Sequence, residues 1–107
     1  MEEQEGTTLQ EMQKIVDSWI RTIGNGYFSP LTNTAILAEE TGEAAAIMAR
    51  TYGNQKSKPG DKDRLADELA DILWVVAAIA NQTDINLQQA FKDNLLKKNT
   101  RDKNRFN

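Results

Sequence analysis

The sequence contains no cysteine and no histidine among its 107 residues. Without cysteine, the chain has no disulfide, no thiolate metal site and no cysteine nucleophile. Without histidine, it lacks the most common general base and has no Ser-His-Asp triad or imidazole-bound zinc. Any chemistry must therefore be carried out by carboxylates, lysine, arginine or a metal ion held by oxygen ligands.

Long hydrophobic runs and a strong net charge are also missing. The longest apolar stretch, Ile72–Ala80, is far too short to span a membrane, and the first residues show no signal-peptide pattern. The formal net charge of −3 disfavours a general nucleic-acid-binding protein. We therefore expect a cytoplasmic protein with neither a membrane nor a nucleic-acid partner. The length predicts one domain.

Apolar residues recur at helical spacing in four segments, and no strand or internal repeat is evident. This pattern predicts an all-α, antiparallel four-helix bundle at 8–107, preceded by a flexible acidic leader at 1–7. The expected segments are 8–23, 32–52, 61–81 and 84–98, with fraying after Lys98. The expected N-caps are Thr8, in a capping box with Glu11, then Asp61 or Asp63, and finally Asp84.

The third segment is apolar almost all the way round between Leu69 and Ala80. A helix of this kind is buried on every side. A single four-helix bundle of this length is too small to cover the third helix on every side. We therefore expect an oligomer with the second and third helices at the interface.

Carboxylates interrupt the apolar faces of these same two helices. Glu40 and Glu43 are three residues apart on the second helix, as are Glu68 and Asp71 on the third, so each pair shares a helix face. Glu39 lies on the adjoining flank. These carboxylates either face solvent, pair with lysine or arginine, or enclose a hard divalent cation such as Mg²⁺ or Mn²⁺.

Gly42 lies between the glutamates of the second helix. Glycine within a helix costs about 1 kcal/mol relative to alanine. Close approach of another backbone, or room for a ligand beside the carboxylates, would each explain it.

Two motifs together resemble a known family. Glu39-Glu40-Thr41-Gly42-Glu43 followed by Glu68-Leu69-Ala70-Asp71 resembles the E-E-x-x-E … E-x-x-D signature of the MazG-like nucleotide pyrophosphohydrolases, which belong to the all-α NTP pyrophosphatase superfamily. The flanking segments 27–31 and 99–103 also resemble the family. The resemblance implies Mg²⁺-dependent hydrolysis of nucleoside triphosphates between the α and β phosphorus atoms, giving a monophosphate and pyrophosphate. It further implies nucleotide-pool housekeeping and a homodimer or homotetramer.

The resemblance also implies roles for particular side chains. Glu40, Glu43, Glu68 and Asp71 would ligate the metal, and Glu39 would orient or deprotonate the attacking water. Because a triphosphate brings several negative charges into an acidic site, we expect cations from the basic end of the chain. The candidates for contacts with phosphate are Lys97, Lys98 and Arg101. A solvated helix end is the alternative for these three residues.

Aromatic residues supply candidates for a base pocket. Phe28, in the loop before the second helix, is a candidate for one wall, and Trp19 is another, with packing in the core as its alternative. Two other functions stay open from the sequence: a non-catalytic helical interaction module, and a nucleoside diphosphate or dinucleotide hydrolase that uses the same metal cage.

Overall fold

The computed structural model describes residues 6–53 and 56–105, with side chains up to residue 101 at the C-terminal end. It contains four helices: α1 (Leu9–Arg21), α2 (Pro30–Tyr52), α3 (Asp61–Gln82) and α4 (Leu87–Arg105). No strand occurs in these ranges, so the all-α prediction is confirmed. Most of the expected acidic leader, residues 1–5, lies outside the described residues. None of the helices described is long and apolar enough to cross a membrane.

Local sequence signals define the starts of α1 and α2. The hydroxyl of Thr8 accepts a hydrogen bond from the backbone N–H of Glu11 at 3.0 Å, and the Glu11 carboxylate accepts one from the N–H of Thr8 at 3.1 Å. The predicted capping box is thus confirmed. Helix α2 begins two residues earlier than expected because Ser29 caps it. Pro30 is favourable at the first position, where no backbone donor is needed.

The expected caps of α3 and α4 were wrong. Gly60 precedes α3 in a left-handed conformation (φ 81°), and Asp61 is already helical. Helix α4 begins at Leu87, where the Asn86 side chain accepts a hydrogen bond from the N–H of Gln89. Asp84 adopts a positive φ of 58° in the preceding turn, which aspartate tolerates better than most residues. The helix also continues to Arg105 instead of fraying after Lys98.

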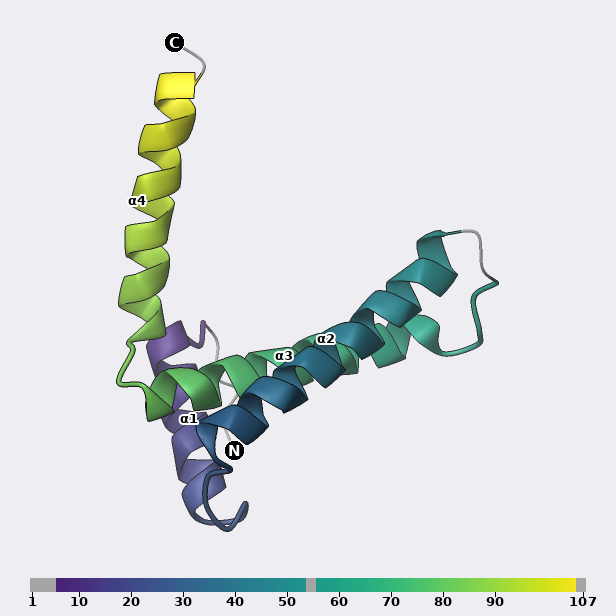
Figure 1. Cartoon of the computed structure of the whole chain (residues 1–107), viewed down its shortest axis with the longest axis horizontal. Coiled ribbons are helices and arrows are strands. Elements are labelled where there is room, and N and C mark those ends of the chain that lie inside the picture. Colours follow the sequence, from purple (N-terminus) through teal and green to yellow (C-terminus); the bar gives the residue numbers. More distant parts are fainter. Residues whose placement is uncertain (1–5, 54–55, 106–107) are drawn as a thin grey trace.

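Helices α2 and α3 run side by side in opposite directions, α1 crosses α3 near its C-terminal end, and α4 extends away from the pair (Figure 1). The core lies at the α1–α3 crossing, where Val16, Ala77 and Ala78 are buried. The radius of gyration is 16.9 Å, whereas a compact chain of this length has about 13 Å. One chain therefore forms an open arrangement with a small core.

Large apolar side chains remain exposed on α3. Leu69 and Leu73 expose 51% and 49% of their surface, and Trp74 exposes 37%. This face of α3 is part of the helix that the sequence predicts to be buried on every side. Within one chain, the other helices leave it uncovered.

Candidate functional site

Three carboxylates converge between α2 and α3. Glu40 of α2 and Glu68 and Asp71 of α3 each place one oxygen within 4.8 Å of the others. The i, i+3 spacing of Glu68 and Asp71 brings both to the face of α3 that packs on α2. Three converging oxygen ligands of this kind suit a hard cation.

Two of these carboxylates each bury one oxygen that has no hydrogen-bond donor among the described residues. Oε2 of Glu40 and Oε2 of Glu68 are buried, and no described residue donates a hydrogen bond to either atom. Two cations of the α2–α3 pair, Arg50 and Arg64, bind a different acid, Asp61. A buried carboxylate without a partner is strongly unfavourable, so the arrangement favours a cation or a proton between the helices.

The pKa values reflect this crowding. The pKa of Glu40 is raised above its ordinary value, chiefly by the hydrogen bond that its protonated form makes with Glu68, then by burial and by the charges of Glu68 and Glu43. The pKa of Asp71 is also raised, first by burial and then by the charges of Asp67 and Glu40. Both groups therefore resist ionisation unless positive charge is supplied.

The remaining predicted acids lie outside the group of three. Glu43 is exposed, although it is close enough for its charge to act on Glu40. Glu39 is exposed on the flank of α2. A Cβ added to Gly42 would meet no atom of the described chain within 4 Å. Close backbone approach within the chain therefore does not explain this glycine, and the surface beside the carboxylates is open.

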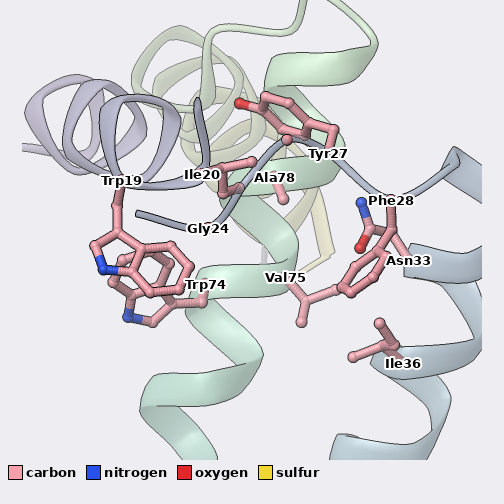
Figure 2. A pocket seen from close by; sticks show the side chains of 11 residues that line it. Trp19, Ile20, Gly24, Tyr27, Phe28, Asn33, Ile36, Trp74, Val75 and Ala78 are labelled. Carbon is pink, nitrogen blue, oxygen red and sulfur yellow. The ribbon is translucent and has the colours of Figure 1, made fainter. Parts of the chain in front are cut away.

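A cavity of about 180 Å³ is lined by residues of α1, α2, α3 and the loop that precedes α2 (Figure 2). Ile36 and Val75 form part of its wall. Each lies one helical turn, about 6 Å, from an acid of the cluster: Ile36 precedes Glu40, and Val75 follows Asp71. The cavity and the carboxylates therefore lie next to each other along the α2–α3 pair.

Both predicted base-pocket residues, Phe28 and Trp19, line this cavity. Trp19 meets Trp74 edge to face, with ring centroids 5.4 Å apart. A Cβ at Gly24 would come within 2.8 Å of the Trp19 ring, so the loop can pass this closely over the indole only with glycine there. The wall is mainly apolar and aromatic, as in pockets that bind flat heterocycles.

Two consecutive amides of α3 hold two consecutive residues of the loop that lines the cavity. Asn81 donates to the hydroxyl of Tyr27 at 3.1 Å, and Gln82 donates to the carbonyl of Phe28 at 2.6 Å. The Tyr27 hydroxyl in turn donates to Asp17. Burial and then this bond raise the pKa of Tyr27, while the same bond lowers the pKa of Asp17. The loop is therefore fixed by side chains from both α1 and α3.

Sequence reasoning did not single out Asn33, a polar residue of the cavity that is buried in the first turns of α2. A signal was available, because Asn33 shares the face of Ile36 and Glu40 at spacings of three and seven residues. A lone amide on that face is a candidate for ligand recognition.

The basic residues predicted to contact phosphate are placed elsewhere. Lys97, Lys98 and Arg101 are exposed on α4. Helix α4 rises away from the α2–α3 pair that carries the acids (Figure 1). A single chain therefore does not bring these side chains to the carboxylates.

Comparisons with known proteins agree with this arrangement. Residues 28–106 match the family model of the MazG nucleotide pyrophosphohydrolase domain. The uncharacterized protein YpjD of Bacillus subtilis (strain 168) is 39% identical over 100 residues, which cover 92% of this chain and 90% of that protein. The crystal structure of the Bacillus-conserved MazG protein, a nucleotide pyrophosphohydrolase, is similar with a TM-score of 0.72 and 36% identity, covering 87% of this chain and 90% of that chain. The crystal structure of YpjD from Bacillus subtilis is similar with a TM-score of 0.77 and 35% identity, covering 91% of this chain and 97% of that chain.

Proposed function

Because the chain belongs to the MazG nucleotide pyrophosphohydrolase family, we propose that it hydrolyses nucleoside triphosphates at the α–β bond in a Mg²⁺-dependent reaction. The products are a nucleoside monophosphate and pyrophosphate. The observation that carries this proposal is the cluster of Glu40, Glu68 and Asp71, in which two buried carboxylate oxygens have no donor among the described residues.

The carboxylates fit a hard metal ion. Glu40, Glu68 and Asp71 would hold Mg²⁺, or Mn²⁺ in its place, and Glu43 would join them by a change of side-chain rotamer. The ion would polarise the phosphate oxygens and lower the pKa of a bound water. Glu39, exposed beside the cluster, would orient the attacking water and accept its proton. This assignment needs no histidine, in keeping with the composition of the chain.

The cavity next to the carboxylates would hold the base. Phe28 and Trp19 contribute aromatic walls, and Ile36 and Val75 of the same cavity lie one helical turn from the metal ligands. A volume of about 180 Å³ is smaller than the roughly 300–1,000 Å³ of pockets that enclose drug-sized ligands. The cavity therefore suits the base alone, with the triphosphate lying along the α2–α3 pair toward the acids.

A second copy of the chain would complete the site. Lys97, Lys98 and Arg101 are placed away from the acids of their own chain, so we infer that they contact the phosphates bound by another protomer of a homodimer or homotetramer. The exposed apolar face of α3, with Leu69 and Leu73, supports burial between copies. We place the enzyme in the cytoplasm, in housekeeping of the nucleotide pool.

A product analysis tests this function. The pure protein is incubated with a panel of nucleoside triphosphates in Mg²⁺ or excess chelator, and the products are separated by anion exchange. We expect monophosphate and pyrophosphate, lost on chelation. Diphosphate and orthophosphate would overturn the cleavage position. Turnover only of diphosphates or dinucleotides would reassign the substrate, and no turnover of any nucleotide would favour an interaction module.

A further inference from the structure

The order of residues along α2 indicates how a nucleotide would lie. Asn33 precedes Glu40 by seven residues, or about 10 Å along the helix axis, and Ile36 lies between them on the same face. If the phosphates lie at Glu40, as the proposed function requires, the base lies against Ile36. The edge of the base that is farthest from the sugar then meets Asn33.

Asn33 is a buried polar residue in a mostly apolar wall. It exposes 5% of its surface and lines the cavity from the α2 side (Figure 2). Its Nδ2 donates a hydrogen bond to Oε1 of Gln82 at 2.9 Å. No described residue donates to its Oδ1. This oxygen is therefore available to accept a hydrogen bond from a ligand in the cavity.

The hydrogen bonds determine the orientation of this amide. The carbonyl of Phe28 can only accept, so the Gln82 side chain must turn Nε2 toward it. Oε1 of Gln82 then faces Asn33 and requires a donor there. Asn33 must therefore point Nδ2 at Gln82, and this leaves its Oδ1 as the acceptor presented to the cavity.

We propose that Asn33 Oδ1 accepts a hydrogen bond from an exocyclic amino group of the base, so that the enzyme selects cytosine and adenine nucleotides. On the edge farthest from the sugar, these bases carry an amino group. Uracil, thymine, hypoxanthine and guanine carry an oxo group there, which would face the amide oxygen with two acceptors in contact. Gln82 does not touch the base in this arrangement, and it acts as a positioning residue through Asn33.

Binding of matched analogues tests the proposal. The probes are the α,β-methylene analogues of CTP, UTP, ATP and ITP, which resist cleavage at the α–β bond. Quenching of the fluorescence of Trp19 and Trp74, which line the cavity, reports binding in the presence of Mg²⁺. We expect the CTP and ATP analogues to bind at least about tenfold more tightly than the UTP and ITP analogues, because a buried base contact discriminates by such factors.

Two variants separate recognition from structural damage. Asn33→Leu removes the acceptor, and Gln82→Met removes the bond that orients Asn33. In both variants the ratio between amino and oxo analogues should fall toward one, while Gln89→Met, a matched change on the exposed surface of α4, should keep the wild-type ratio. Circular dichroism checks the fold of each variant. If Asn33→Leu does not fold, the result for Gln82→Met decides the test.

The outcomes distinguish this inference from the proposed function. Hydrolysis of all triphosphates with no preference for amino bases, or a preference that survives in both variants, would overturn the role of Asn33 and leave the enzyme assignment intact. If no analogue binds and no triphosphate is hydrolysed, the proposed function fails, and the inference that rests on it fails as well.

Discussion

Glu40 of α2 and Glu68 of α3 place carboxylate oxygens within 4.8 Å of each other, and each buries one oxygen that no described residue partners. Two like charges this close, and partly removed from water, destabilise the folded chain. The pKa of Glu40 is raised first by its hydrogen bond with Glu68, then by burial and by the charges of Glu68 and Glu43. An arrangement that is unfavourable for folding but suited to a cation is typical of a functional site.

Replacing Glu40 by glutamine should separate stability from activity. The amide removes one charge and can donate to Glu68, so we expect the metal-free variant to unfold a few degrees above the wild type in a thermal melt. Turnover should fall more than about a hundredfold because a ligand is lost. Asp63→Asn, an exposed change at the start of α3, is the control and should alter neither property. Retained turnover in the Glu40 variant would refute the metal assignment.

Metal binding should raise the thermal stability of the wild type. A ligand that binds only the folded state adds RT ln(1 + [L]/Kd), which is about 2.7 kcal/mol at a hundred times Kd. We expect a concentration-dependent rise of the unfolding temperature with Mg²⁺ or Mn²⁺, reversed by chelator. Glu40→Gln should show little of this rise. An equal rise in both proteins would place the metal elsewhere.

Asp61 should contribute to stability in a pH-dependent way. Its pKa is held well below the ordinary range by Arg50, then by the backbone N–H of Lys58 and by Arg64. Because the folded-state pKa is lowered, the contribution is complete above the unfolded value of about 3.9 and is lost as the pH falls below it. Asp61→Asn should therefore unfold more easily than the wild type at pH 7, and the difference should shrink toward pH 2.

Urea titrations at pH 7, 4 and 2.5 would measure this effect, with Asp63→Asn as the matched control on the same turn. A difference between the wild type and Asp61→Asn that stays the same at all three pH values would show that the ionised carboxylate of Asp61 does not stabilise the fold.

Mixed oligomers test whether two copies share a site. Glu40→Gln lacks a metal ligand, and a chain with Lys97→Gln and Arg101→Gln lacks the proposed phosphate contacts, so each alone should be nearly inactive. In a random mixture of dimers formed by refolding the two together, about a quarter of the sites would carry both intact sets. We therefore expect activity to return to about that level.

The control for this experiment combines Glu40→Gln with Asp71→Asn. Both acids belong to the same chain's cluster, so every site in the mixture carries a defect and no activity should return. Recovery in the control, or none in the first mixture, would contradict a site shared between copies.

Much of the fold is predictable from the sequence because its signals are local. The capping box at Thr8 involves residues three apart, and the paired acids on α2 and α3 follow from helical spacing. The start of α3 was misassigned because the Asp61 carboxylate binds Arg50 from α2 instead of capping its own helix. The start of α4 was misassigned because Asp84 and Asn86, two residues apart, both suit a cap.

The part of the site that sequence reasoning missed depends on long-range contacts. Asn33 becomes a candidate for base recognition through Gln82, which is 49 residues away, and no local pattern shows that bond. The position of α4 is equally non-local, since the helix packs on α1 and leaves Phe91 61% exposed. Apolar periodicity predicts that α4 is a helix, but it does not specify what that helix packs against.

The most direct test follows the phosphorus signals of a triphosphate by ³¹P NMR, with the wild type and Glu40→Gln compared at equal concentration in Mg²⁺. The wild type should convert the triphosphate to monophosphate and pyrophosphate. This conversion should stop when chelator is added and resume when Mg²⁺ is restored, whereas the variant should show no conversion. Equal rates in the two proteins, or conversion that continues in excess chelator, would contradict a metal-dependent pyrophosphohydrolase centred on these carboxylates.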